Sequence, residues 1–169
     1  MPETIHQKID LLSIRAAFEP TTFDAENSTV EVIWSTGVGV KRYDYQNSCY
    51  FNEVLEISSS AIDLTRLNSG APLGVVERAW IDKNVGKALI RFSSRDDVAP
   101  IIQDVKSGIL RSISVGYKVN KYEIQQRDGE IPTYTATEWT PMELSLVPIP
   151  ADIGAQVRSE NITQPTKEA

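Results

Sequence analysis

Apolar and polar residues alternate in steps of two over most of this chain, which predicts a structure dominated by β-strands. Val30, Val32 and Trp34, for example, fall on one face of an extended chain. Runs of this kind predict strands at residues 11–18, 29–34, 38–45, 53–57, 74–81, 87–92, 112–124, 132–139 and 142–148. Residues 82–86 are predicted to turn a hairpin, with Gly86 available for a positive φ.

Two segments show features of helices. Residues 58–67 begin with serines that can cap a helix, and they carry an apolar side. The second helix is predicted to begin at Ser94, where Asp97, three residues on, completes a variant of the capping box. It can end at Gly108. Its apolar residues recur at helical spacing and are Val98, Ile101, Ile102, Val105 and Ile109.

Many short strands with few helices predict a mainly β (α+β) fold. The favoured architecture is a closed or nearly closed antiparallel β-barrel with two or more helices packed outside it. An open antiparallel sheet with helices fits the same periodicity, because periodicity does not record which strands pair. Residues 1–10 are predicted to be a flexible N-terminus, 11–150 the barrel domain, and 151–169 a polar C-terminal tail.

Composition narrows the function. The formal net charge is −6 and the basic residues are scattered, which argues against a surface that follows nucleic-acid phosphates. No apolar run approaches the length needed to span a membrane. The single cysteine, Cys49, excludes an internal disulfide and fits a reducing cytoplasm. A soluble domain with one hydrophobic core is therefore expected.

The strand at residues 112–118 holds the first candidates for chemistry. Its small residues share one face, opposite the apolar face, and are Ser112, Ser114 and Gly116. A strand face of small residues lets a substrate backbone approach closely. A solvent-facing edge without a role gives the same pattern, so the pattern alone does not distinguish a substrate-binding face from such an edge.

A serine nucleophile needs a base, which is usually histidine. The one histidine, His6, lies in the polar N-terminal stretch and is predicted to be exposed rather than catalytic. No Ser-x-x-Lys spacing supports a lysine base. Glu143 points away from the apolar face of its strand, where a carboxylate either orients an imidazole or is simply the polar half of the alternation.

No cofactor or metal is expected. One histidine and one cysteine cannot build a zinc site, and Gly37-Val-Gly39 lacks the third glycine of a phosphate loop. Asp96 and Asp97 are better explained as charges at a helix N-terminus than as catalytic acids. Cys49 has no neighbour in sequence that would activate it, and is interpreted as a structural or incidental thiol.

Three stretches, in order along the chain, carry a family resemblance. The first is Phe23-Asp-Ala-Glu-Asn-Ser-Thr-Val-Glu-Val-Ile-Trp-Ser-Thr36. The second runs from Gly74-Val-Val-Glu-Arg-Ala-Trp80 to Gly108-Ile-Leu-Arg-Ser-Ile-Ser-Val-Gly-Tyr117, and the third is Met142-Glu-Leu-Ser-Leu-Val-Pro-Ile-Pro-Ala-Asp152. In these stretches the chain resembles the prohead (capsid-maturation) serine proteases of tailed bacteriophages, which share the barrel fold of the herpesvirus assemblins.

The resemblance assigns roles to particular residues. It implies that Ser114 is the nucleophile and that Glu143 is the third member of a catalytic triad. The family's histidine lies in a loop just before the Leu-Gly-Val-Val strand, but here the chain passes from Asn68 to Val76 without a histidine. The join at Leu73–Gly74 is therefore either a true deletion closed by a tight turn, or a place where the loop is missing from the sequence.

The function implied by the resemblance is a serine endopeptidase that processes scaffold and capsid protein during prohead maturation and finally cleaves itself. Its implied substrates are the major capsid protein and a scaffold segment, inside the immature capsid in the host cytoplasm, and a homo-oligomer is a further candidate assembly. No nucleic acid or membrane partner is expected. The missing base favours an alternative, an inactive homologue that binds shell or scaffold partners. An unrelated β-rich binding module is the third alternative.

Overall fold

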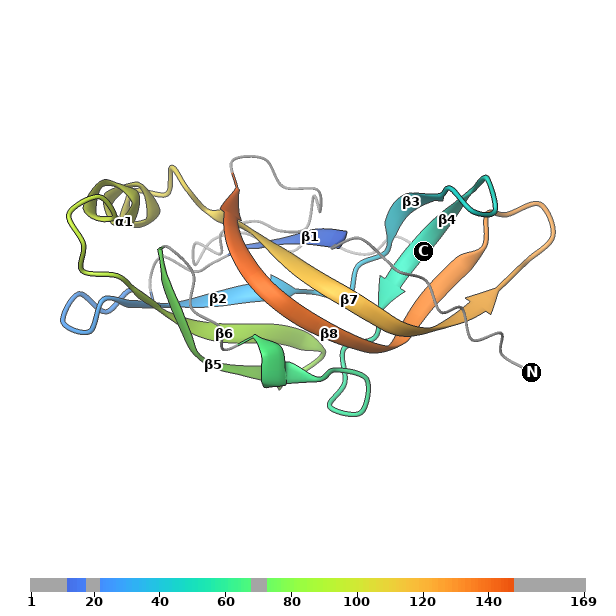
Figure 1. Cartoon of the computed structure of the whole chain (residues 1–169), viewed down its shortest axis with the longest axis horizontal. Coiled ribbons are helices and arrows are strands. Elements are labelled where there is room, and N and C mark those ends of the chain that lie inside the picture. Colours follow the sequence, from blue (N-terminus) through green and yellow to red (C-terminus); the bar gives the residue numbers. More distant parts are fainter. Residues whose placement is uncertain (1–11, 18–21, 68–72, 148–169) are drawn as a thin grey trace.

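The computed structural model of the chain describes residues 12–17, 22–67 and 73–147, the first of these as backbone only. The predicted N-terminal segment 1–10 and tail 151–169 lie outside the described residues. The elements follow in the order β1 Leu12–Ala17, β2 Thr29–Ser35, β3 Val40–Asp44, β4 Cys49–Leu55, the 3-10 helix η2 Leu64–Arg66, β5 Gly74–Asp82, β6 Val85–Phe92, α1 Ala99–Lys106, β7 Ser112–Gln125 and β8 Thr133–Val147 (Figure 1). The predicted mainly β fold is confirmed.

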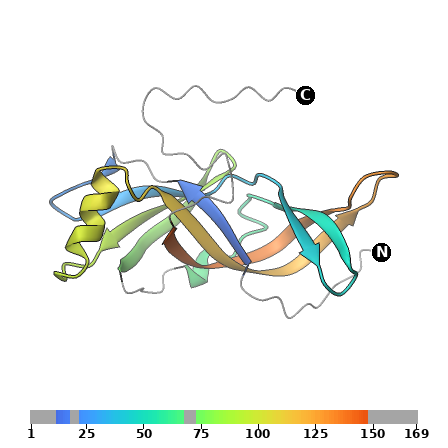
Figure 2. The same cartoon turned by 90° about the horizontal axis from the view of Figure 1, so that it is seen from above.

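The strands form two sheets. The larger has five strands in the order β1-β7-β8-β4-β3, and the smaller has three in the order β2-β6-β5. All described pairs are antiparallel except β4 with β8, which is parallel. The helix α1 lies at one end of the molecule, and the β3–β4 hairpin and the turn that joins β7 to β8 lie at the other (Figure 2).

The closed or nearly closed barrel is not found among the described residues. The two sheets come together where β1 lies beside β2, but these strands do not pair. On the other side, β4 pairs with β8 only from Thr133 to Ala136. The later half of β8 is therefore not paired with a second described strand on that edge. In place of the predicted antiparallel barrel with two or more helices, the described residues form two separate sheets that include one parallel strand pair, with one α-helix.

The helical predictions also need correction. Within residues 58–67 the only helix is the short 3-10 helix η2, and its N-cap is Asp63, which accepts a hydrogen bond from the Thr65 amide, rather than a serine. The helix α1 begins at Ala99, with Pro100 in its first turn, where the fixed φ of proline suits a helix start. Asp97 therefore lies before the helix and pairs with Arg95, with 2.9 Å between Oδ1 and Nε, instead of closing a capping box.

The apolar face of α1 lies largely where the pattern predicted it. Val98 and Val105 are fully buried, and Ile101 and Ile102 are half-buried. Ile109 follows the end of the helix and is exposed. Gly108 has a φ of 75°, the left-handed conformation that commonly follows a helix C-terminus.

The core lies between the two sheets and is organised around aromatic side chains. Trp34 of β2 and Trp139 of β8 are both buried and meet edge to face, with 5.8 Å between ring centroids. Tyr117 of β7 meets Trp139 in the same way at 5.7 Å. The indole of Trp34 donates to the Lys87 carbonyl at 2.8 Å, so its polar atom is paired in the core.

The β5–β6 hairpin places its glycine differently from the prediction. Lys83 and Asn84 form the two-residue turn, with φ of 48° and 65°, as in a type I′ turn. Gly86 instead lies in β6 under the Trp34 ring, where a Cβ atom would be 2.5 Å from the nearest ring atom. This glycine is required because the indole fills the space that a side chain would need.

The substitution Gly86→Ala tests this contact. We expect it to lower the free energy of unfolding by about 1–3 kcal/mol, because the buried Trp34 must move to admit the methyl group. Gly39→Ala is the matched control, since a Cβ there would meet its nearest neighbour at 3.5 Å, an ordinary contact. Urea denaturation of the three proteins measures both values. Equal stability of all three would contradict this account.

Two turns of the structure share the sequence pattern Asp-x-x-Asn-Ser. In the turn between β3 and β4, Asp44 Oδ1 accepts from the Gln46 and Asn47 amides, and its Oδ2 accepts from the Asn47 side chain at 2.8 Å. Asp24 makes the equivalent bonds in the turn before β2. Burial alone would raise the pKa of Asp44, but these hydrogen bonds and one from the Tyr134 hydroxyl lower it below its usual value.

A pKa lowered in the folded state means that ionised Asp44 stabilises the fold above its ordinary pKa, and that this stability is lost as pH falls through the lowered pKa. We expect Asp44→Asn to cost about 1.5–3 kcal/mol at pH 7, the range for hydrogen bonds to a charged group. The difference from the unaltered protein should begin to shrink below about pH 4, where the carboxyl becomes protonated in the unfolded chain, and should disappear once it is protonated in the folded protein as well. Urea denaturation at several pH values measures it. A difference that does not change with pH would contradict the assignment.

Candidate active site

The strand β7 places Ser114 in the interior of the five-stranded sheet. Ser114 is opposite Arg15 of β1 on one side and opposite Ser145 of β8 on the other. Ser112 and Ser114 are only 3% and 7% exposed, so the small-residue face of this strand is covered at these two serines rather than solvent-facing. Both serines lie on an inner strand of the sheet, which has a neighbouring strand on each side.

Glu143 lies on the same face of the sheet as Ser114. It is opposite Gly116 in the β7–β8 register, and a Cβ atom on Gly116 would lie 2.8 Å from Glu143 Cγ and 3.2 Å from its Oε1. The carboxylate side chain therefore folds over the glycine. Because Ser114 and Gly116 are two residues apart on one strand, Ser114 and Glu143 are diagonal neighbours.

The structure supplies no base to this pair from the described residues, which contain no histidine. His6 lies outside them. Arg15, which sequence reasoning did not single out, is opposite Ser114 in the register, but a guanidinium remains protonated and cannot accept the serine proton. Its position follows from strand pairing, which no local sequence pattern reveals.

The segment from which the family's histidine is missing borders β5. Residues 68–72 lie outside the described residues. From Leu73 onward the chain is paired with the neighbouring strand, because the Leu73 carbonyl accepts from the Ser93 amide at 2.8 Å and Gly74 is opposite Phe92. A regular ladder thus runs across the Leu73–Gly74 join.

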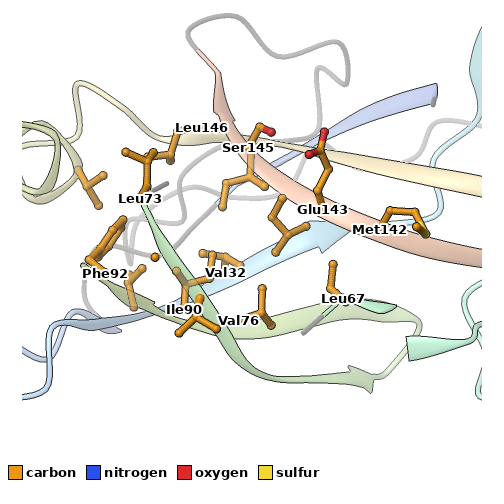
Figure 3. Close-up of a pocket in the computed structure, with 16 residues that line it drawn as sticks. Val32, Leu67, Leu73, Val76, Ile90, Phe92, Met142, Glu143, Ser145 and Leu146 are labelled. Carbon is orange, nitrogen blue, oxygen red and sulfur yellow. The ribbon is translucent and has the colours of Figure 1, made fainter. Parts of the chain in front are cut away.

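An apolar cavity of about 310 Å³ lies between the later half of β8 and the smaller sheet (Figure 3). Its floor comes from β2, β5 and β6, and its other side from β8. The side chains of Glu143 and Ser145 border the cavity but point away from it, onto the opposite face of β8 (Figure 3). Its apolar lining includes Val32, Val76, Ile90, Phe92, Leu144 and Leu146. The cavity was not foreseen, because it depends on how two sheets meet.

A buried carboxylate holds the core side of β7. Glu53 of β4 is fully buried and accepts hydrogen bonds from the hydroxyls of Tyr117 and Tyr122. Arg42 Nε lies 3.5 Å from Glu53 Oε1 and supplies the opposite charge. Burial, and then the negative charge of Glu53, raise the pKa of both tyrosines, so both hydroxyls remain donors. Glu53 falls on the apolar face of its strand in the sequence, and this alternation is the signal that could have predicted a buried carboxylate.

We expect Glu53→Ala to destabilise the protein by about 3–5 kcal/mol, because it removes the acceptor of two buried hydroxyls and the negative charge beside Arg42. Glu56→Ala, at an exposed glutamate that follows β4, is the matched control and should be nearly neutral. Thermal and urea unfolding measure both. A near-neutral Glu53→Ala would show that this cluster does not anchor β7.

In the described part of the chain, no helix has the length and apolar composition that crossing a membrane would need. The described side chains also form no group of three or more potential metal ligands.

Comparison with known proteins identifies the family of the chain. The family model described as caudovirus prohead serine protease matches residues 51–168, well over half of the chain, so the chain belongs to that family. It is also similar to a protein named "Major capsid protein" from Halomonas phage phiHAP-1, with 37% identity over 114 residues, covering 59% of this chain and 19% of the relative. The chain thus spans about a fifth of that relative's length. No solved structure matches it.

Proposed function

We propose that this chain is a serine endopeptidase of prohead maturation, in which Ser114 is the nucleophile and Glu143 orients the base. The observation that supports this most is that Glu143 lies over Gly116, on the same face of the sheet as Ser114 and diagonal to it. The chain belongs to the family of prohead serine proteases, which supports the same proposal. The reaction would be acyl transfer from a peptide bond, with backbone amides holding the oxyanion.

The spacing of the pair suits a triad. Diagonal neighbours in an antiparallel pair are about 7–8 Å apart, which leaves room for an imidazole between hydroxyl and carboxylate. The imidazole would take the proton of Ser114 through one nitrogen and donate to Glu143 through the other. The substrates proposed are capsid and scaffold polypeptides, and the relative named as a major capsid protein supports this class. Self-cleavage, a homo-oligomer and a location inside the immature capsid remain predictions of the same proposal.

A second candidate function is a catalytically inactive homologue that binds shell or scaffold proteins. Two observations favour it, namely the lack of a histidine among the described residues and the burial of Ser114. A buried hydroxyl without a base cannot attack a peptide carbonyl until both access and proton transfer are provided.

Cleavage of purified capsid and scaffold polypeptides by the full chain distinguishes the two functions. If the chain is a protease, Ser114→Ala should reduce cleavage by at least about a thousandfold, as removal of a nucleophile does in serine proteases, and leave the fold intact. Ser112→Ala, at the neighbouring small residue of the same face, should be much milder. An essential Ser112 and a dispensable Ser114 would reverse the assignment.

Added imidazole tests the missing base separately. If the chain lacks only a base, free imidazole should stimulate cleavage by the unaltered protein and have no effect on Ser114→Ala. His6→Ala should not change cleavage if His6 is not the base. No cleavage with or without imidazole, together with specific binding of capsid protein, would instead establish the inactive homologue.

A further inference from the structure

The hairpin of β3 and β4 carries a group of exposed aromatic side chains. Tyr43 and Tyr50 are opposite each other in the register and are 40% and 52% exposed, and Tyr45, which follows β3, is 86% exposed. The ring centroid of Tyr43 lies 4.9 Å from that of Tyr50 and 5.0 Å from that of Tyr45. Lys41 Nζ lies 4.6 Å from the centroid of the Tyr50 ring. We call these four side chains the tyrosine platform.

The hairpin that carries the tyrosine platform is anchored from its core side. Phe51 follows Tyr50 in β4, is buried, and stacks on Tyr134 of β8 with 4.3 Å between ring centroids. The Tyr134 hydroxyl donates to Asp44, whose carboxylate also closes the turn between β3 and β4. The rings of the platform are therefore positioned before a partner arrives, which lowers the entropy cost of binding.

The size of the platform fits a short segment of polypeptide better than a folded partner. The exposed parts of the three tyrosines amount to roughly 270–450 Å², at about 150–250 Å² for each aromatic side chain. Exposed apolar patches of this size are often functional. A stable dimer buries about 800 Å² on each subunit, so the three tyrosines alone would not hold a second copy of the chain.

The polar atoms of the platform can all donate hydrogen bonds. Each tyrosine ends in a hydroxyl, and Lys41 ends in an ammonium group, which donates but cannot accept. Within the described part of the chain, these four groups form no hydrogen bond with another residue. A partner that is rich in unpaired carbonyl oxygens therefore matches the platform.

We propose that the tyrosine platform binds a proline-rich segment in the polyproline II conformation. Neighbouring rings of the platform stand at 72° and 75° to each other, which leaves notches where a proline ring can pack on an aromatic face. Polyproline II has no internal hydrogen bonds, so its carbonyl oxygens are free to accept from the hydroxyls and from Lys41. Because Tyr45 and Tyr50 lie 5.0 Å and 4.9 Å from Tyr43, their centroids are at most about 10 Å apart. One polyproline II turn rises about 9 Å and can span that distance.

The preformed conformation of such a segment matters because the platform is small. Proline fixes φ, so a polyproline II segment loses little chain entropy when it binds. Ordering a flexible segment costs about 1–2 kcal/mol per residue, which would offset much of the stabilisation from contact with three rings.

The tyrosine platform is separate from the candidate active site, so this inference goes beyond the proposed function. Along β8, Thr133 lies beside Asn52 of the hairpin, whereas Ser145 lies beside Ser114. These two positions of β8 are 12 residues apart, which is roughly 40 Å along the strand. A segment bound to the platform is therefore docked away from Ser114, and its binding does not depend on whether the chain cleaves peptides.

The test uses the full chain carrying Ser114→Ala, so that cleavage does not consume the probe. The probe is a fluorescein-labelled peptide with the sequence Pro-Pro-Leu-Pro-Pro-Leu-Pro-Pro. Its control is the mirror-image peptide built from D-amino acids, which has the same composition but a helix of the opposite hand. Fluorescence anisotropy measures affinity, and the ring-proton NMR signals of the tyrosines report where the peptide binds. We expect the L-peptide to bind at least tenfold more tightly than its mirror image and to shift the signals of Tyr43, Tyr45 and Tyr50.

Two variants of Tyr45 separate the ring from its hydroxyl. Tyr45→Ala should weaken binding of the L-peptide at least tenfold, because it removes the most exposed ring of the platform. Tyr45→Phe keeps the ring and loses one donor, so it should weaken binding about two- to tenfold, the range for a single hydrogen bond. Ile109→Ala, at an exposed apolar residue outside the platform, is the matched control and should bind normally. Circular dichroism verifies that the variants fold, and the NMR result does not depend on any of them.

Equal binding of the two mirror-image peptides, no binding at all, or NMR shifts confined to residues outside the platform would overturn the inference. Normal binding by either Tyr45 variant would do the same. Analytical ultracentrifugation of the unaltered chain tests a second copy as the occupant. Self-association that Tyr45→Ala abolishes would assign the platform to contacts between copies of the chain and would also overturn the inference.

Discussion

The antiparallel pairing of β7 with β8 is the constraint on which the rest of this structure depends. It runs from Ser112 opposite Val147 to Gln125 opposite Thr133 and brings both long strands through the middle of the larger sheet. The core face of this pair carries Tyr117 and Trp139, which pack against each other and bury the interior. The opposite face carries Ser114 and Glu143. One set of backbone hydrogen bonds therefore fixes both the core and the candidate site.

The same pairing explains why the candidate nucleophile is buried in this structure. An inner strand has neighbours on both sides, and small side chains on it become covered, as Ser112 and Ser114 are. Gly116 is small because Glu143 occupies the space above it. On the core face, the buried Glu53 binds the hydroxyls of Tyr117 and Tyr122 and ties β4 to β7. Glu53 therefore anchors β7 on its core face. On the opposite face, Ser114 has no histidine base among the described residues.

The apolar cavity lies where the later half of β8 faces the smaller sheet. A closed barrel would use every strand edge, whereas here β8 continues past its pairing with β4, and β5 ends the smaller sheet.

The sequence by itself determined most of the strands and the face on which each candidate residue lies. Period-two alternation is local, so it identified the strand of Ser114 and placed Glu143 away from the apolar face, and the structure agrees on both. It also indicated the buried side of α1 through Val98 and Val105. Helix and turn details were less secure, because Pro100 and the I′ turn at Lys83–Asn84 depend on backbone geometry that competes with capping and glycine signals.

Only the tertiary structure decided which strands pair and what each residue meets. The parallel pairing of β4 with β8, the split into two sheets and the position of Gly86 under Trp34 are contacts between residues far apart in sequence. Alternation records which side of a strand is apolar, but it does not record which strand lies beside it. For that reason the sequence did not predict the burial of Ser114, the contacts of Glu53 with two tyrosines and Arg42, or the cavity beside β8. Each of these is produced by neighbours that only the fold brings together.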